Sequence, residues 1–150
     1  MVANDFLNKR VLKCTYDVAV NGGVDDTAYT IGYLPAGAIV TGGFGIVRTA
    51  FDDGADESTT IAIGYAGAAS AFMAATAGSA VNAFTNLVFT LLPGQAALDV
   101  DAAHDTAAEV AALVAASYIV LSASKAVIVT LSNDTNFTAG KIDIYLEYVL

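Results

Sequence analysis

The C-terminal segment from Lys141 to Leu150 alternates strictly between two sets of side chains. A period of two places successive side chains on opposite faces of a β-strand, so the pattern predicts a strand with one buried face. The expected buried face consists of Ile142, Ile144, Leu146, Tyr148 and Leu150, and the opposite face of Lys141, Asp143, Tyr145 and Glu147.

Another strand is expected just before it, over residues 126–131, where four β-branched residues follow one another. The intervening residues 133–140 are rich in Asn, Asp and Gly, which are typical of turns. We therefore expect two adjacent strands that pair in an antiparallel manner.

The start of the chain gives a similar signal. Leu12, Cys14, Tyr16, Val18 and Val20 alternate with more polar positions, and the Asn-Gly-Gly sequence at residues 21–23 then predicts a turn. Further strands are expected over residues 29–33, 38–51, 59–65, 86–92 and 117–121. Short strands at fairly regular spacing are typical of a sandwich or jelly roll.

Two Ala-rich segments, residues 66–83 and 95–116, give no firm periodicity. Alanine favours helix, and Thr106 with Glu109 fits a capping box, so residues 107–116 are the one helix candidate. We predict a mainly β fold, an antiparallel, jelly-roll-like β-sandwich with at most one short helix. Its organisation would be an N-terminal arm over residues 1–10 and a single β-sandwich domain over residues 11–150.

The charge composition argues against nucleic-acid binding. The formal net charge is −9 with only six Lys and Arg, and the one small cluster of cations is Lys9, Arg10 and Lys13. Charged residues make up 14% of the chain, which leaves much of the surface to Ala, Gly, Ser and Thr. Such a surface suits burial against partners, and a simple Ala-rich composition bias explains it equally well.

Nothing in the sequence indicates a targeting or membrane segment. Residues 1–10 lack an apolar core of the signal-peptide type. The longest apolar stretch, residues 110–121, is about 12 residues, whereas a membrane helix needs roughly 20. We expect a soluble protein, and its single Cys14 excludes an internal disulfide and fits synthesis in a reducing cytoplasm.

Residues capable of metal binding are sparse. His104 is the only histidine, which is too few for a cupin-type metal site. Two acidic segments, residues 52–57 and 99–105, could bind a divalent cation weakly. We favour an exposed hairpin tip for the first and a solvated loop for the second, and we expect no metal and no cofactor.

Signals for catalysis are also missing. Cys14 lies on the apolar face of its predicted strand, where the alternation points its side chain inward, which indicates a buried structural thiol. The serines lack a nucleophile-elbow context, and the glycines at residues 42–45 lack the Lys and Ser/Thr of a phosphate-binding loop. We therefore predict that the protein is not an enzyme.

Four residues are candidates for contact with a partner. Phe6, Leu7 and Arg10 belong to an arm that could reach a neighbouring subunit, or to a frayed terminus. Arg48 is an isolated cation in an apolar strand, so it either pairs with an acidic group of a neighbouring subunit or lies on the solvent face.

Short strings along most of the chain resemble small virion proteins encoded in tailed-phage genomes. They are residues 34–40 (Leu-Pro-Ala-Gly-Ala-Ile-Val), 49–51, 61–64, 138–141 and 147–149. The resemblance implies a β-sandwich or jelly-roll subunit, often a homotrimer, that binds the major capsid protein on the outer capsid surface and cements it. It also implies a virion location after synthesis in the bacterial host cytoplasm, and no catalytic residues.

Two other functions remain open at this point. A receptor- or glycan-binding tail or fibre domain on the same sandwich predicts a surface cluster of Tyr29, Tyr33, Tyr65 and Tyr145. A metal-dependent jelly-roll enzyme would depend on His104.

Overall fold

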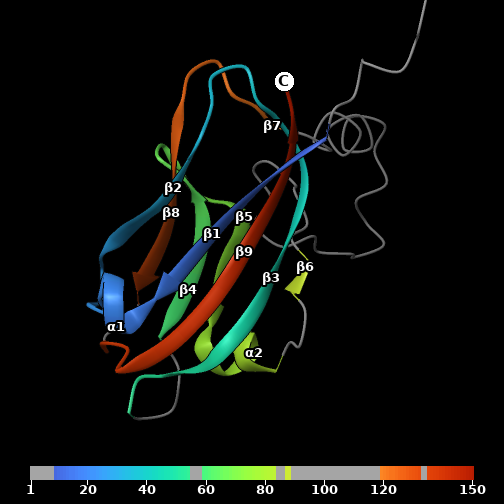
Figure 1. The fold of residues 1–150 in the computed structure, drawn as a ribbon. Helices are drawn as coiled ribbons and strands as arrows, with labels where there is room; N and C mark the ends of the chain where they lie inside the picture. The colour runs from blue at the N-terminus through green and yellow to red at the C-terminus, as the bar shows by residue number, and fades with distance from the viewer. Residues whose placement is uncertain (1–8, 55–58, 84–86, 89–118, 133–134) are drawn as a thin grey trace, which may run out of the picture.

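A computed structural model describes residues 9–54, 59–83, 87–88, 119–132 and 135–150, and in these residues the chain forms two antiparallel sheets (Figure 1). In the first sheet the strand order is β1-β9-β3-β6, and β7 also pairs with β3. In the second sheet the order is β2-β8-β4-β5. The strands are β1 (Arg10–Asp17), β2 (Ala28–Leu34), β3 (Ile39–Asp52), β4 (Thr60–Tyr65), β5 (Ala68–Ala77), β6 (Leu87–Val88), β7 (Ile119–Val120), β8 (Lys125–Ser132) and β9 (Ala139–Val149).

The pairing is that of a jelly roll. The strands pair from the two ends of the chain inward, β1 with β9, β2 with β8, β3 with β7, and β4 with β5. Successive pairs alternate between the two sheets, as when one long hairpin is wrapped into a double layer. The predicted mainly β, jelly-roll-like sandwich is therefore confirmed.

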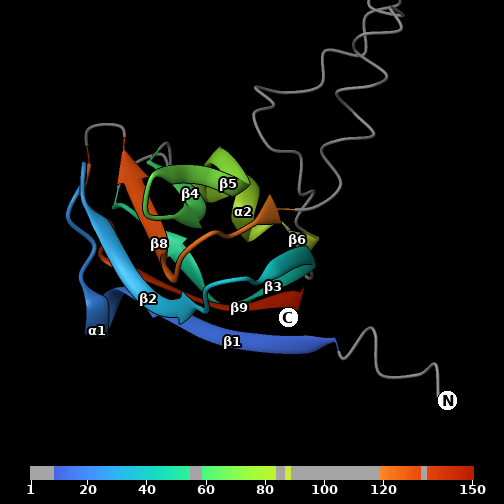
Figure 2. The same cartoon turned by 90° about the horizontal axis from the view of Figure 1, so that it is seen from above.

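The hydrophobic core lies between the two layers, which Figure 2 shows from above. Each sheet turns its apolar alternate positions inward, because one face of each strand must leave water. The first sheet contributes the fully buried Ile142, Ile144 and Leu146 of β9, and the second contributes Val127, Val129 and Leu131 of β8. The buried face predicted for the C-terminal strand is confirmed at these three β9 positions. It is wrong at Leu150, which follows the end of β9 at Val149 and is 58% exposed.

A group of aromatic rings closes one end of this core. Tyr16 of β1 stacks on Phe51 of β3 with a centroid distance of 6.2 Å and lies 5.6 Å from the ring of Tyr29 in β2. Phe137, in the connection before β9, lies 5.3 Å from Phe51. The buried Tyr16 hydroxyl donates a 2.6 Å hydrogen bond to the carbonyl of Gly22, and burial raises its pKa. The rings thus tie both sheets to the connections at this end.

The expected pairing of the last two strands is wrong. β8 pairs with β2 and β4 in the second sheet, whereas β9 pairs with β1 and β3 in the first. Both strands have one apolar face, and they bury those faces against each other across the core instead of joining edge to edge. The segment between them passes from one layer to the other, and the Phe137 and Thr138 amides donate to the carbonyls of Gly23 and Asp52.

Two short helices occur among the described residues, where at most one was expected. α1 (Val18–Asn21) follows β1 directly, so the first strand ends at Asp17 and does not continue to Val20. The Asp17 carboxylate accepts from the Ala19 amide as an N-cap, which stops the strand and starts the helical turn. α2 (Gly78–Asn82) follows β5. The helix candidate at residues 107–116 lies outside the described residues.

Candidate functional site

Arg48 is a predicted partner contact in the interior of a described strand, β3, and a β-bulge directs it. In the β3–β9 ladder Val47 pairs with Ile142 and Thr49 with Lys141, which leaves Arg48 as the extra residue. A bulge of this kind re-aims a side chain. Here the Nε of Arg48 donates to Oδ2 of Asp143 on β9 at 2.9 Å, and the side chain stays 47% exposed.

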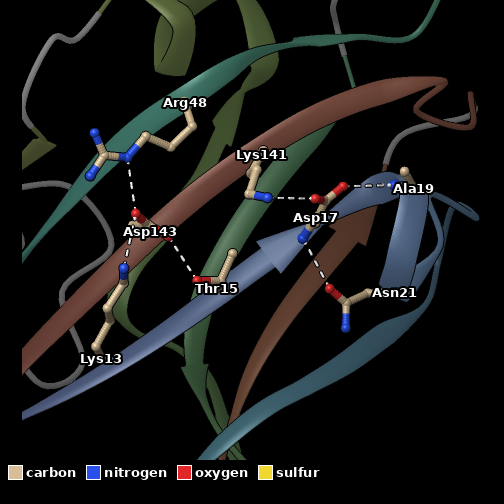
Figure 3. Close-up of polar contacts among 8 residues, drawn as sticks. All are labelled: Lys13, Thr15, Asp17, Ala19, Asn21, Arg48, Lys141 and Asp143. Atoms are coloured by element: carbon tan, nitrogen blue, oxygen red, sulfur yellow. Dashed lines mark hydrogen bonds and ion pairs between the residues drawn. The ribbon is translucent and has the colours of Figure 1, made fainter.

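Asp143 is the centre of this outer surface (Figure 3). It is only 6% exposed, although it lies on the outward side of β9. Its Oδ1 accepts a 2.7 Å hydrogen bond from the Thr15 hydroxyl of β1, and Nζ of Lys13 lies 3.4 Å from its Oδ2. The Thr15 hydrogen bond, with those from Arg48 and Lys13, holds the pKa of Asp143 below its usual value despite burial. One buried carboxylate thus fixes two half-exposed cations.

Two aromatic rings lie beside these cations. Tyr145 stacks on Phe44 of β3 with a centroid distance of 4.7 Å. Nζ of Lys13 lies 5.6 Å from the centre of the Tyr145 ring, within the range of a cation–π contact. The surface therefore combines Arg, Tyr, Phe and Lys in one place, and Arg and aromatic residues are enriched in protein interfaces.

Two more ion pairs flank this centre on the same side of the sheet. Nζ of Lys9 lies 3.2 Å from Oε2 of Glu147, and Nζ of Lys141 lies 2.9 Å from Oδ2 of Asp17. The Lys141 contact lowers the pKa of Asp17. We call the whole surface the charged face. It consists of Lys9, Lys13, Thr15, Asp17, Phe44, Arg48, Lys141, Asp143, Tyr145 and Glu147.

The charged face has a different charge balance from the rest of the chain. It carries four of the six Lys and Arg residues and three of the fifteen Asp and Glu residues, for a formal charge of +1. The remaining two cations and twelve carboxylates give −10. Most of the chain's cations are therefore concentrated on one side of one sheet.

The outer face of the second sheet is chemically different, and we call it the uncharged face. Its positions follow from the inward Val127, Val129 and Leu131 of β8 and from the register of β2 and β4. None of its residues is charged, and most are small. They are Ala28, Thr30, Tyr33, Thr60, Ala62, Gly64, Ala126, Ile128, Thr130 and Ser132.

The other predicted partner contacts are only partly described. Arg10 is exposed, but it is the first residue of β1 and pairs with Tyr148, so the sheet begins inside the predicted arm. Phe6 and Leu7 lie outside the described residues. Lys13, Thr15 and Asp143, which complete the surface around Arg48, were missed. The alternating patterns placed them on outward faces, but nothing in the sequence indicated that β1 and β9 pair.

The candidate metal and thiol sites have separate outcomes. Cys14 is buried as predicted, and burial raises the pKa of its thiol to about 11. The predicted exposed hairpin at residues 52–57 is wrong at Asp53. This carboxylate is buried and accepts from the Thr59 amide and hydroxyl, and the connection passes from β3 in one sheet to β4 in the other. Asp56, Glu57, His104 and residues 99–105 lie outside the described residues.

Within the described parts of the chain, no group of three or more His, Cys, Asp or Glu side chains is arranged to hold a metal ion. In the same parts, no helix has the length and apolar character needed to cross a bilayer.

The four tyrosines expected to form a binding surface do not gather in one place. Tyr29 and Tyr65 point inward with the core positions of the second sheet, and Tyr65 lies 5.9 Å from the ring of Phe72. Tyr33 points outward from that sheet and is 67% exposed. Tyr145 lies on the charged face of the other sheet. These four tyrosines therefore do not form the surface cluster that the receptor- or glycan-binding alternative requires.

These features define a double-sheet jelly roll with one charge-paired face and one uncharged face. No protein-family model matches the chain, and no curated protein matches it. Solved structures do match. A chain in the capsid asymmetric unit of cyanophage Pam1 is similar with a TM-score of 0.64 and 18% identity, over 95% of this chain and 85% of that chain.

Two further phage capsid structures contain similar chains. In the acidic stable capsid of the Helicobacter pylori bacteriophage KHP30, the TM-score is 0.56 at 14% identity, over 95% of this chain and 87% of that chain. In the capsid of Ralstonia phage GP4, the TM-score is 0.56 at 16% identity, over 93% of this chain and 84% of that chain. The common feature at these identities is the fold, and it extends over nearly the whole chain.

Proposed function

We propose that the chain is a structural, non-catalytic protein of a tailed-phage virion, a capsid decoration protein that binds the major capsid protein on the outer surface and cements it as a homotrimer. The observation that carries this proposal is the jelly roll shared with chains of three phage capsid structures over 93–95% of its length. A tail location is the alternative.

The surface chemistry supports a role in assembly. A cement protein needs a rigid body and broad contact areas, because many modest contacts multiplied over a symmetric shell give high avidity. The two sheet faces supply such areas, one with preset ion pairs and aromatic rings and one with small uncharged side chains. In the proposed role these surfaces act only by binding, and no reaction is catalysed.

We propose that the N-terminal arm, residues 1–10, contacts a neighbouring subunit. Phe6 and Leu7 are its apolar pair, and Arg10 lies where the arm meets the first strand. A chain lacking residues 1–8 should keep its fold, because β1 begins at Arg10, and should bind capsids more weakly than the full chain. Equal binding by the two chains would remove the arm from the proposal.

The location is tested in virions of the phage that encodes the chain. Heads and tails are separated, and the protein is quantified in each by mass spectrometry and located on intact particles by electron microscopy with a specific antibody. The proposal expects the protein on heads, outside the shell. Protein found only on tails would support the alternative, and protein absent from virions would overturn both.

The cement role needs a second measurement. Heads assembled without the protein are mixed with the purified full chain, sedimented, and then heated while DNA release is followed. We expect saturable binding and a higher release temperature. Binding without any gain in stability would leave a surface protein that does not cement.

A further inference from the structure

The structure holds a second charged region, at the end of the sandwich where α1 lies (Figure 1). The segments at residues 22–27, 52–54 and 135–138 meet there. The Asp25 amide donates to the Asn136 side chain at 2.8 Å, and the Thr138 amide donates to the Asp52 carbonyl at 2.7 Å. These segments contain no Lys or Arg.

Exposed carboxylates and valines lie together in this region. Asp26 and Asp52 are both exposed. Val20 of α1 and Val24 beside it are 80% and 55% exposed. We call Val20, Val24, Asp26 and Asp52 the acidic end. Its carboxylates with adjacent apolar groups are chemically complementary to the cations and rings of the charged face.

We propose that the charged face of one copy binds the acidic end of a second copy, head to tail, and that this contact builds the homotrimer. The inference rests on the trimeric state in the proposed function and names its interface. The contact joins two different patches, so it is heterologous, and a heterologous contact forms a closed ring when its rotation closes.

The electrostatics favour this head-to-tail contact over a symmetric contact between two charged faces. Two copies with a net charge of −9 repel each other overall, and a face-to-face contact would oppose the Lys13 and Arg48 cations of both copies. A head-to-tail contact instead places those cations against carboxylates. Complementary potentials of this kind fix which surfaces meet.

The arrangement of Arg48 suits it to this contact. Asp143 accepts from the Nε of Arg48, which leaves the two terminal nitrogens of the guanidinium outside this contact, and the side chain is 47% exposed. A guanidinium can present those nitrogens to an incoming carboxylate while its Nε is held. The buried Asp143 therefore orients the cation in advance and lowers the conformational entropy lost on binding.

The test measures the oligomeric state of the purified full chain by analytical ultracentrifugation. Lys13→Gln and Arg48→Gln each remove one cation from the charged face, and Lys125→Gln removes one from β8, outside both patches. Asp26→Asn and Asp52→Asn remove carboxylates from the acidic end. Asn tolerates the φ of 51° at Asp26 and keeps the oxygen that accepts from Gly54 at residue 52.

We expect a wild-type trimer that dissociates about tenfold more readily in each charged-face and acidic-end variant, and unchanged association in Lys125→Gln. A mixture of Arg48→Gln with Asp26→Asn should form dimers, because one intact interface remains per pair. Thermal unfolding of each variant checks that the fold is retained. Where Arg48→Gln fails this check, Lys13→Gln and the salt dependence decide the outcome.

Salt dependence gives a test without any substitution. Raising NaCl from about 0.05 M to about 0.5 M should weaken wild-type association at least tenfold, because the Debye length becomes shorter. A monomeric wild-type chain, a trimer indifferent to salt, or equal loss in Lys125→Gln would overturn the inference. If the wild-type chain is a trimer and the charged-face variants associate as tightly as it does, the proposed interface is wrong but the trimer stands. The proposed virion role is tested separately, and it fails if heads lack the protein.

Discussion

The two sheets bury similar aliphatic side chains between them but present different chemistry on their outer faces. On the charged face, Asp143 is nearly buried by the side chains that it binds, and each contact is directional. On the uncharged face, the methyl side chain of Ala62 is only 5% exposed although it lies on the outward side of β4. The charged face depends on charge and hydrogen bonding, whereas the uncharged face has the Thr60–Ser132 hydrogen bonds at its edge and otherwise depends on close packing.

This difference predicts opposite sensitivities. Substitutions that change size should matter most on the uncharged face, and those that change charge should matter most on the charged face. A substitution that changes charge should have the larger effect on stability on the charged face, because the described ion pairs lie there. The same type of substitution, made once on each face, can therefore test the comparison directly.

The largest effect is expected from adding one methyl group at glycine. At Gly64 of β4 a Cβ would collide with the backbone oxygen of Ala68, whereas at Gly42 of β3 it would meet only Oε2 of Glu147 at 3.8 Å. Gly64→Ala should lower the free energy of unfolding by about 3 kcal/mol, and Gly42→Ala should change it by less than about 1 kcal/mol. Urea unfolding measures both, and equal losses would contradict the packing argument.

The next largest effect is expected at the centre of the charged face. Asp143→Asn keeps the side-chain shape but removes the charge that holds Lys13 and Arg48, so stability should fall by about 1–2 kcal/mol. Glu147→Gln, the matched control, removes a carboxylate that is 37% exposed and that pairs with Lys9 alone among the described residues. It should cost less than about 0.5 kcal/mol. A control that costs as much would mean that burial of Asp143 has no special role.

The effect of Asp143 should also depend on pH. Its pKa in the folded chain lies below the ordinary value because Thr15, Arg48 and Lys13 favour the ionised form. A carboxylate with a lowered folded pKa stabilises the fold fully above the unfolded pKa and loses that contribution as the pH falls through the folded value. The stability gap between wild type and Asp143→Asn should be constant above about pH 5 and close in acid.

Urea unfolding of both chains at a series of pH values measures this gap. Other carboxylates protonate in both chains, so the difference between them isolates Asp143. A gap that persists unchanged at the lowest pH would show that the carboxylate charge does not stabilise the fold.

Much of the fold could be predicted because alternation reports which side of a strand is buried. The strands at the chain ends and the inward Ile142, Ile144 and Leu146 followed from this signal alone. Alternation does not report which strand lies alongside. The expected pairing of the last two strands failed for that reason, and the contact of Thr15 with Asp143, 128 residues apart, was out of reach.

The Ala-rich residues 66–83 show a second limit. Alanine favours helix, yet residues 68–77 form β5 because they pair with β4 and bury Phe72 and Met73. Tertiary pairing overrides the weak local preference there. At the candidate site, Arg48 was identifiable as an isolated cation in an apolar strand. Its partner was not, because the bulge that aims it depends on the register with β9.

The smallest expected effect comes from two threonines, one on each face. The Thr15 hydroxyl donates to Asp143, whereas the buried Oγ1 of Thr130 has no hydrogen-bond partner among the described residues. Thr15→Val should therefore lower the free energy of unfolding by about 1 kcal/mol, because Asp143 loses a donor. Thr130→Val replaces an unsatisfied hydroxyl with a methyl group of similar size, so it should raise stability by about 0.5 kcal/mol. Urea unfolding at neutral pH gives both values, and a loss at Thr130 as large as that at Thr15 would mean that the Thr130 hydroxyl makes a stabilising polar contact.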